Sequence, residues 1–505
     1  MHSVRMTVVA PQVATARTGL QLTREFATRL DEAGIRYCHF KSNQHLEAAL
    51  QGITDMDVLV DRRAGPKLTE ILGGLGCKRF SAPPSGDYPA VEDHLGFDRP
   101  TGRLIHLHLH HRLTAGEKHL KGYRLPWEEL MLSTSRKDPA TGFRAADPNV
   151  ECLLLLVRSG LKLGAADGVL AWLGRDQVGD DVAREFAWLM KRVDPEHLVE
   201  LGESLLGKPV GSALRKILLD GPSVGRLFAL RARGRPALER FRSYSGVEAT
   251  LRRTWRMLFL AFCALGRKLP NPPMPVSRKN PRGGLLIAFL GADGSGKSSL
   301  ARRVVKWLRW KLDARVAYFG SGDGPSSLLR LPFRQALRWV IASRSGPRIT
   351  PLRDRVPTGV RALWALVLAL EKRRRLMQAW RARNQGLVIV CDRYPQDQIK
   401  GFSDGPLLDR WRRSRWPWLR MLARWEAMPY AWAISHPPDL VLKLRVTPVV
   451  AVRRKPEMRL DDVCRRERAI ADLGFPVATR VREVNADRPW DDVLLECKRE
   501  IWEEL

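Results

Sequence analysis

Residues 291–298 read Gly-Ala-Asp-Gly-Ser-Gly-Lys-Ser and match the pattern G-x-x-x-x-G-K-[ST] at every fixed position. The apolar run Leu285–Leu290 precedes this loop. An amphipathic segment follows it, with one apolar stripe at Leu300, Val304, Leu308 and Leu312. This context predicts a buried strand, a glycine-rich turn and a helix whose N-terminus faces the turn. The sequence therefore predicts a site for a nucleoside triphosphate.

Each residue type of the loop has a predicted role. The glycines let the backbone turn and present its N–H groups to phosphate oxygens. We expect Lys297 to reach the β- and γ-phosphates and the Ser298 hydroxyl to ligate Mg²⁺. The predicted cofactors are thus ATP and Mg²⁺. The predicted nucleotide-binding residues are Gly291, Asp293, Gly294, Ser295, Gly296, Lys297, Ser298 and Ser299.

After the loop, strand patterns alternate with helical ones. Strands are predicted at 315–319, 387–391 and 440–446, which favours a parallel sheet with right-handed crossovers. Asp392 and Arg393 directly follow the second of these strands, so we expect them at the same sheet edge as the loop. A carboxylate there can hold Mg²⁺, and an arginine can bind an acceptor phosphate. A structural salt bridge at a strand end is the alternative.

A third group of candidates is basic and follows the strand at 440–446. Arg453, Arg454 and Arg459 lie in one short segment. Arginines from a mobile lid can stabilise the negative charge that develops during phosphoryl transfer. The alternative is a solvated basic helix face.

Together these motifs resemble the thymidylate kinase family over residues 284–505. The matching segments are GADGSGKSS, VIVCDRYP, PPDLVLKLRVTPVVAVRRK and the closing segment from Val484 to Trp490, in the family's order. The resemblance implies a nucleoside-monophosphate-kinase fold that transfers the γ-phosphate of ATP to an acceptor phosphate. It also implies that Asp293 contacts the acceptor's sugar hydroxyl and Arg393 its phosphate. The predicted catalytic residues are Lys297, Asp392, Arg393, Arg453, Arg454 and Arg459, and the predicted magnesium ligands are Ser298 and Asp392.

The chain departs from this family in three places. The segment 395–406 replaces the helix that reads the thymine ring, and 320–325 replaces the acceptor-binding segment. Arg445 stands where the family usually has an acidic residue. The expected partner is therefore a phosphate-bearing small molecule, with a nucleotide, a sugar phosphate and a lipid-linked phosphate all open.

An N-terminal group of carboxylates suggests a second site. Asp55 and Asp57 lie two residues apart on a predicted strand and so share one face. Such a pair can hold a divalent metal for nucleotidyl transfer, while turn hydrogen bonds at a strand end are the alternative. The segment Phe40–Val60 resembles the nucleotidyltransferase superfamily. That resemblance implies a phosphate contact at the turn 41–43 and a third carboxylate on a later strand.

The best candidate for that later strand is 104–111, which reads LIHLHLHH. His106 occupies the position where the resemblance implies an aspartate. His106, His108 and His110 alternate onto one face and are either a metal set or structural histidines. Because imidazole does not replace an anionic oxygen ligand for Mg²⁺, we predict that Mg²⁺-dependent nucleotidyl transfer is weak or absent. A softer ion would accept the imidazole better.

A segment rich in proline and basic residues divides the chain. The predicted organisation is a nucleotidyltransferase-like domain at 1–147, a helical region at 148–266, a linker at 267–283 and the thymidylate kinase-like P-loop domain at 284–505. The predicted fold class is α/β throughout, apart from the helical middle region. In the last domain, helices are expected to cover a parallel sheet.

Charge and cysteine usage indicate partners and compartment. The formal net charge of +32 predicts attraction to polyanions, whether nucleotides, nucleic acid or an anionic membrane. Seven dispersed cysteines are typical of reduced thiols in the cytoplasm. No apolar run approaches the roughly 20 residues of a membrane span, so any membrane contact is expected to be peripheral. Oligomeric state stays open.

Tryptophans interleaved with arginines at 410–432 allow three readings. Core packing is favoured, a membrane interface is second and nucleic-acid stacking is third, since no nucleic-acid-binding motif accompanies them. A rival to the kinase function is therefore a nucleotide-gated binding or scaffold protein at a membrane surface.

Overall fold

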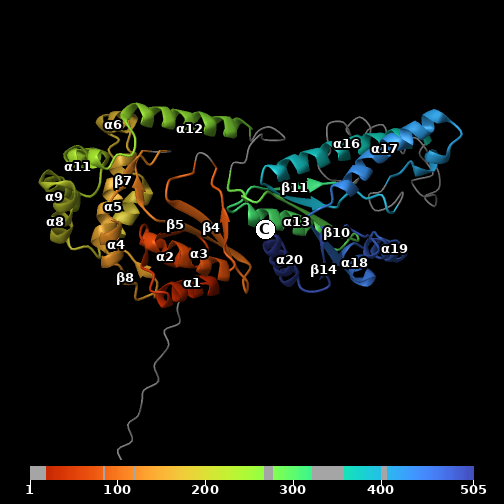
Figure 1. Cartoon of the computed structure of the whole chain (residues 1–505), viewed down its shortest axis with the longest axis horizontal. Helices are drawn as coiled ribbons and strands as arrows, with labels where there is room; N and C mark the ends of the chain where they lie inside the picture. Colours follow the sequence, from red (N-terminus) through yellow and green to blue (C-terminus); the bar gives the residue numbers. More distant parts are fainter. Residues whose placement is uncertain (1–18, 84–85, 118–119, 267–276, 321–357, 400–405) are drawn as a thin grey trace, which may run out of the picture. The chain divides into compact units, whose positions relative to one another are not determined.

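The computed structural model describes residues 19–83, 86–117, 120–266, 277–320, 358–399 and 406–505. The chain divides into two compact units (Figure 1). The first comprises Met1–Arg79 and Pro84–Leu260, and the second comprises Phe80–Pro83 and Ala261–Leu505. Most of the predicted linker lies outside the described residues. Its end, from Ser277, packs on the second unit, where the Ser277 backbone N–H donates to Asp313.

The first unit contains a mixed seven-stranded sheet in the order β3-β4-β5-β2-β1-β9-β8. Pairs β2·β5 and β1·β9 are parallel, whereas β1·β2, β4·β5 and β8·β9 are antiparallel. The strands are β1 (Tyr37–His39), β2 (Met56–Val60), β3 (Lys78–Phe80), β4 (Val91–Asp98), β5 (Arg103–His110), β8 (Arg136–Lys137) and β9 (Arg144–Ala145). A separate hairpin pairs β6 (Leu113–Ala115) with β7 (Tyr123–Leu125).

Apolar and histidine side chains alternate along β5, so the two faces of this sheet differ in character. Ile105, Leu107 and Leu109 pack into a core with three helices, α1 (Gln21–Glu32), α2 (Leu46–Leu50) and α3 (Gly65–Gly74). Since successive side chains of a strand point to opposite faces, the histidines of β5 lie on the other face.

The predicted helical region shares a second core with the sheet. Cys38 and Leu59 of the sheet belong to the same cluster as α5 (Pro148–Lys162). Asp147 caps α5 by accepting from the backbone N–H of Asn149, and Pro148 fits the first turn. The other helices of the first unit are α4 (Glu128–Thr134), α6 (Ala165–Trp172), α7 (Asp180–Leu189), α8 (Pro195–Leu206), α9 (Gly211–Asp220), α10 (Val224–Arg233), α11 (Arg235–Arg240) and α12 (Gly246–Gly266), which continues to the start of the second unit. Short 3₁₀ turns occur at η1 (Asn43–His45), η2 (Arg62–Ala64) and η3 (Lys208–Val210).

The second unit confirms the predicted parallel sheet. Its strand order is β11-β12-β10-β13-β14, and every neighbouring pair is parallel. The central strand β10 is buried at all positions, as its unbroken apolar run requires. The strands are β10 (Leu285–Gly291), β11 (Ala314–Tyr318), β12 (Val388–Asp392), β13 (Leu440–Arg445) and β14 (Arg480–Asn485).

Helices cover both faces of this sheet. One face of β10, carrying Leu286, Ala288 and Leu290, shares a core with residues of α16, α17 and α19. Ile287 and Phe289 point the other way and are also fully buried, and α13 and α20 contact the sheet and each other. The helices are α13 (Lys297–Leu308), α16 (Thr358–Asn384), α17 (Pro417–Ser435), α18 (Pro448–Arg454), α19 (Leu460–Ala471) and α20 (Trp490–Glu504), with a 3₁₀ turn at η5 (Asp409–Arg413).

In the described ranges, none of the helices has both the length and the apolar composition that crossing a bilayer requires. All seven cysteines lie in the described ranges, and none of them forms a disulfide bond.

Candidate functional site

The glycine-rich loop connects β10 to α13 as the sequence predicts. Gly294 and Gly296 both have φ of +87°, a left-handed conformation that favours glycine. At Gly294 space excludes a side chain as well, because a Cβ there would lie 2.7 Å from the carbonyl oxygen of Ala451 in α18. The loop is thus pinned between the central strand and α18 by positions that only glycine tolerates.

Lys297 is folded back over this loop. Its side chain is buried, and its ammonium group donates to the carbonyl oxygen of Ala292 at 2.7 Å. Ser298 and Ser299 in the first turn of α13 are exposed, whereas Ser295 is buried and its hydroxyl has no hydrogen-bond partner among the described residues. The lysine can exchange its carbonyl partner for a phosphate oxygen without leaving the loop.

Asp392 and Arg393 come to this edge of the sheet from β12. Asp392 pairs in register with Phe289 of β10, so the end of β12 lies beside the start of the glycine-rich loop. Asp392 is 3% exposed, and within the described chain its Oδ1 accepts no hydrogen bond. A buried carboxylate oxygen without a donor is costly, and a bound cation would offset that cost.

Asp293 joins the loop to two arginines. Its Oδ1 lies 2.6 Å from an Nη of Arg393, and its Oδ2 pairs with Arg466 of α19. The Lys297 ammonium lies 3.8 Å from the same carboxylate. Three cationic side chains therefore converge on one acidic residue of the loop. Arg466 was not among the sequence-based candidates, because it is one arginine among several in α19 and only the fold brings it to Asp293.

The predicted lid arginines lie on and just after α18. Arg454 ends this helix and donates to the carbonyl oxygen of Ala486 at 3.0 Å. Arg453 is exposed, and so is Arg459, which precedes α19. Arg445, the departure from the resembled family, pairs with Glu467 at 2.6 Å and with Glu483 at 3.3 Å.

The chain reverses direction across the sheet at this edge. From β10 the chain goes to β11 on one side, whereas from β13 it goes to β14 on the other, and β10 and β13 are neighbours. In open α/β sheets, ligands bind at the carboxyl ends of strands at such a switch point. The glycine-rich loop and α18 are the two connections that diverge there.

The first unit has its own polar cluster on the histidine face of its sheet. Asp93 of β4, His108 of β5 and Asp57 of β2 stand abreast in register on three neighbouring strands. His106 lies between two carboxylates, with Asp93 2.7 Å from its Nε2 and Asp55 2.9 Å from its Nδ1. β4 therefore adds a third carboxylate, Asp93, to this cluster, whereas the strand predicted for such a residue is 104–111.

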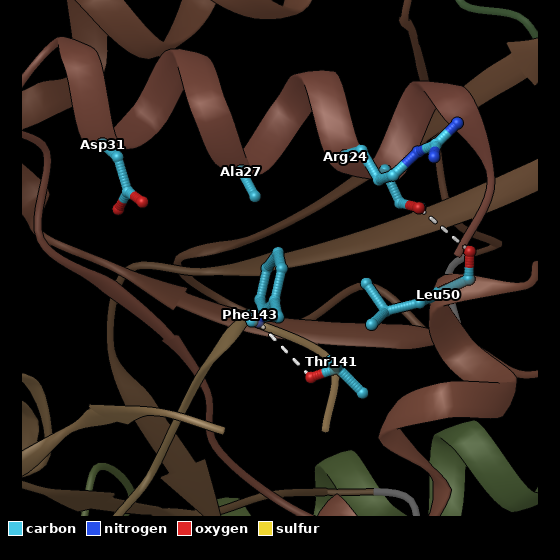
Figure 2. Close-up of a pocket in the computed structure, with 8 residues that line it drawn as sticks. Arg24, Ala27, Asp31, Leu50, Thr141 and Phe143 are labelled. Atoms are coloured by element: carbon cyan, nitrogen blue, oxygen red, sulfur yellow. Dashed lines mark hydrogen bonds between the residues drawn. The ribbon is translucent and has the colours of Figure 1, made fainter. Parts of the chain in front are cut away.

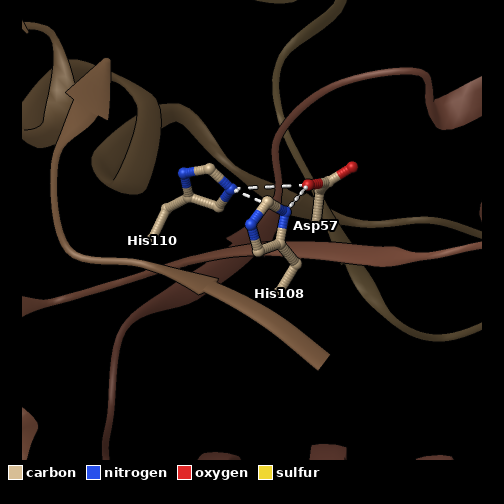
Figure 3. A group of neighbouring side chains, drawn as sticks. All are labelled: Asp57, His108 and His110. Carbon is tan, nitrogen blue, oxygen red and sulfur yellow. Dashed lines mark hydrogen bonds and ion pairs between the residues drawn. The ribbon is translucent and has the colours of Figure 1, made fainter. Parts of the chain in front are cut away.

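Asp57 is the most crowded member of this cluster. Its Oδ1 lies 2.9 Å from the Lys41 ammonium. The same oxygen lies 2.8 Å from His108 Nδ1 and 3.3 Å from His110 Nε2 (Figure 3). Burial alone would raise the pKa of Asp57, but Lys41 and the two histidines outweigh it and hold that pKa well below its usual range. Burial lowers the pKa of both His108 and His110, so their rings are neutral near pH 7.

The turn 41–43 is held by carboxylates. The backbone N–H of Ser42 donates to Glu185 of α7 at 3.0 Å, and that of Asn43 donates to Glu151 of α5 at 2.8 Å. Burial raises the pKa of Glu151 to about 7. In the resembled nucleotidyltransferases this turn contacts phosphate, but here two carboxylate side chains already accept from its N–H groups.

A pocket elsewhere in the first unit is less promising. It lies between α1 and the segment 141–143, and its lining includes Arg24, Ala27, Leu50 and Phe143 (Figure 2). Its one carboxylate, Asp31, is paired with Lys137 at 2.6 Å. None of the predicted site residues lines it.

The tryptophan- and arginine-rich segment is partly core and partly surface. Trp411 and Trp432 pack against buried clusters and Trp425 is half-buried. Trp416 and Trp418 are each more than half exposed. The favoured prediction of core packing therefore fits three of the five tryptophans.

No family model matches the chain. Curated proteins similar to it include "Uncharacterized ATP-binding protein YghR" of Escherichia coli (strain K12), which is 28% identical over 224 residues, or 43% of this chain and 86% of that protein. "Uncharacterized ATP-binding protein YghS" of the same strain is also 28% identical over 224 residues, 92% of its own length. Both names refer to the binding of ATP.

Proposed function

We propose that this chain is an ATP- and Mg²⁺-dependent phosphotransferase of thymidylate-kinase-like type, which transfers the γ-phosphate of ATP to the phosphate group of a small-molecule acceptor. The observation that carries the proposal is one sheet edge where the glycine-rich loop, the buried Asp392 and the Asp293 arginine pair meet. Two relatives named as ATP-binding proteins support the nucleotide part.

The loop residues fit a triphosphate. Lys297 exchanges the carbonyl oxygen of Ala292 for oxygens of the β- and γ-phosphates, and the N-terminus of α13 favours their negative charge. Mg²⁺ also fits, because Asp392 has a buried oxygen in need of a positive partner and Ser298 offers an exposed hydroxyl. When bound, the ion neutralises charge on the phosphate oxygens.

The acceptor phosphate is assigned to Arg393. Asp293 holds Arg393 and Arg466 beside the loop, so both guanidinium groups are positioned before substrate enters. A phosphate carries more negative charge than a carboxylate, and it can accept two hydrogen bonds from one arginine guanidinium group. Arg453, Arg454 and Arg459 are assigned to charge stabilisation from the α18–α19 connection. Asp293 thereby acts as a positioning residue, which differs from the sugar contact that the resemblance implies.

The test is γ-phosphate transfer from labelled ATP to a panel of nucleoside monophosphates, phosphosugars and lipid-linked phosphates. Lys297→Ala should remove most transfer, whereas Lys306→Ala, an exposed lysine on the same helix, should retain it. Full activity of Lys297→Ala would refute the proposal. Transfer to one acceptor class alone would identify the substrate, and hydrolysis of ATP with no acceptor phosphorylated would favour the second candidate.

The second candidate is a nucleotide-gated protein at an anionic membrane surface, and α12 favours it. Along this helix, apolar residues recur at spacings of three and four and each is more than half exposed, while Ala249 and Cys263 on the opposite face are buried. Arg252, Arg253 and Arg256 lie on the face of the helix away from this stripe. An apolar face opposite a basic one is typical of helices that lie in a lipid interface. The stripe consists of Val247, Leu251, Trp255, Leu258, Phe262 and Leu265.

Co-sedimentation with vesicles tests this candidate. The full chain should bind vesicles rich in phosphatidylserine and not neutral ones, and Leu251→Glu with Phe262→Glu should reduce binding at least tenfold. Val477→Glu, which alters an exposed apolar residue elsewhere, is the matched control. Equal binding by the double variant would exclude α12 as the lipid contact, and a concentration-dependent dimer lost in that variant would assign the stripe to a second copy of the chain.

A further inference from the structure

The histidine face of the first sheet brings together donor atoms of a kind that magnesium does not prefer. Asp57 Oδ1, His108 Nδ1 and His110 Nε2 lie within 4.8 Å of one another. The two histidines are on β5 and Asp57 is on β2, and the parallel register Asp57↔His108 fixes their alignment (Figure 3). The ligand set therefore comes from two hydrogen-bonded strands of one sheet, which makes it rigid.

We propose that Asp57, His108 and His110 form a binding site for a divalent transition-metal ion, with Zn²⁺ the best match to the donor atoms. This site goes beyond the proposed kinase function and is independent of it, since all three residues lie in the first unit.

The separations of the donor atoms fit such an ion. The two ring nitrogens lie 3.3 Å apart, and Asp57 Oδ1 lies 3.3 Å from His110 Nε2 and 2.8 Å from His108 Nδ1. A tetrahedral ion with bonds of about 2.0–2.1 Å places its ligands about 3.3–3.4 Å apart. Two of the three separations already have this value. The third needs to open by about half an ångström.

The chemistry of the nitrogens points the same way. His108 Nδ1 and His110 Nε2 face each other and the same carboxylate oxygen. In a neutral imidazole one nitrogen carries the proton and the other presents a lone pair, so each of these two nitrogens either donates to Asp57 or is free to bind a metal ion, depending on the tautomer. In the tautomers that present both lone pairs, a metal ion satisfies the two nitrogens and the carboxylate at once. Imidazole nitrogen suits Zn²⁺, whereas Mg²⁺ demands oxygen ligands.

The surroundings assign roles to the remaining polar residues. Asp93 Oδ1 lies 4.0 Å from Nε2 of His108, beyond hydrogen-bond distance, and accepts instead from His106 at 2.7 Å. His106 is left out of the ligand set, because its Nε2 is hydrogen-bonded to Asp93 and its Nδ1 lies 2.9 Å from Asp55. Lys41 competes with the ion for Asp57. Its side chain is 23% exposed and flexible, so it can move away.

Metal titration of the full chain tests the site. After treatment with a chelator, the protein should bind one Zn²⁺ per chain, at least 100-fold more tightly than Mg²⁺. Asp57→Asn and His108→Gln should each weaken Zn²⁺ binding at least tenfold. His111→Gln, at the next position after β5 and outside the donor set, should bind Zn²⁺ as the parent does. Cobalt serves as a spectroscopic probe: its visible absorption should appear on binding and disappear when Zn²⁺ is added.

A further variant keeps the proposal testable if the substitutions of the ligand residues prevent folding. Lys41→Met removes the competing charge from a partly exposed position, so it should raise Zn²⁺ affinity about tenfold. Lys297→Ala should leave Zn²⁺ binding unchanged, which separates this site from the proposed kinase site. Zn²⁺ binding by an Asp57→Asn, His108→Gln double variant as tight as that of the parent chain would overturn the proposal. So would Lys41→Met binding Zn²⁺ no better than the parent.

Discussion

Asp57 in the first unit and Asp392 in the second are carboxylates on strands of two sheets, yet their surroundings differ in kind. Asp57 Oδ1 is contacted by a lysine and two neutral histidines. Asp392 is more deeply buried, and its Oδ1 has no donor in the described part of the chain. Asp57 suits a metal ion that also binds nitrogen ligands. Asp392 suits a hard metal ion whose other ligands are oxygens of phosphate and water.

The two turns beside these carboxylates differ in a similar way. The turn 41–43 donates backbone N–H groups to Glu185 and Glu151, so its anion site is filled by the protein itself. The loop 291–298 instead has Lys297 bonded to a carbonyl oxygen and Asp293 paired with arginines. Positive charge is concentrated at the second turn and compensated at the first. The comparison indicates that triphosphate chemistry belongs to the second unit.

The largest effect is expected for Lys297→Ala. Loss of the only lysine in the loop removes charge stabilisation at the transferred phosphate, and we expect γ-phosphate transfer to fall about 10²–10³-fold. Steady-state kinetics against Lys306→Ala measures it. If instead Lys41→Ala in the first unit abolished transfer to the same extent, the assignment of triphosphate chemistry to the second unit would be wrong.

Glu151→Gln tests the surroundings of the turn 41–43 through the pH dependence of protein stability. The folded pKa of about 7 lies above the unfolded value near 4.5, so the folded state alone holds this proton between those values. The parent chain therefore loses stability as pH rises from 5 to 8, by about 2–3 kcal/mol relative to Glu151→Gln. Urea unfolding at both pH values measures the change. If the free energy of unfolding changed with pH by the same amount in both proteins, the raised pKa of Glu151 would be contradicted. A pH-independent difference in stability between the two proteins would not affect this conclusion.

Asp392→Asn should separate activity from stability. The amide is a poorer metal ligand, so phosphate transfer should fall about 10–100-fold. Removing a buried charge without a donor at Oδ1 should also stabilise the fold by about 1 kcal/mol, seen as a higher melting temperature.

The matched control for this prediction is Asp439→Asn, at the position directly before β13. Asp439 accepts from the backbone N–H of Leu286 at 2.7 Å and pairs with Arg383, so this change should destabilise the fold by about 2 kcal/mol. A fall in melting temperature for both variants would show that Asp392 is a structural carboxylate.

The smallest effect is expected at Arg466. Arg466→Ala leaves Asp293 with one arginine fewer, so we expect kcat/KM for the acceptor to fall about tenfold with little change in KM for ATP. Arg468→Ala, an exposed arginine on the same helix, should behave like the parent. An equal loss in both variants would indicate a general charge effect and not a specific position.

The sequence alone was sufficient for the second unit's sheet. An unbroken apolar run such as 285–290 is stable only when covered on both faces, and the loop that follows is defined by fixed glycines, so periodicity and motif agree. The ends of the strands at 387–391 and 440–446 were within two residues of the observed bounds for the same reason. In these strands the local sequence pattern and the tertiary environment favour the same structure.

The candidate sites were predicted less completely, because their members come from several elements. Asp93 joins the first cluster only because β4 pairs antiparallel with β5 and places it opposite His108. Arg466 reaches Asp293 across more than 170 residues of sequence. Glu151 and Glu185 reach the turn 41–43 because α5 and α7 pack beside it. None of these side chains has a local signal that separates it from a surface charge.

The sequence by itself thus determined the α/β class, the parallel sheet after residue 284 and the phosphate-binding loop, since each depends on the order of neighbouring residues. Tertiary structure alone decided which carboxylates are crowded, which retain an oxygen without a donor and which arginines converge. The physical reason is that burial and charge pairing depend on distances in space, and strand register and helix packing set those distances across long stretches of the chain.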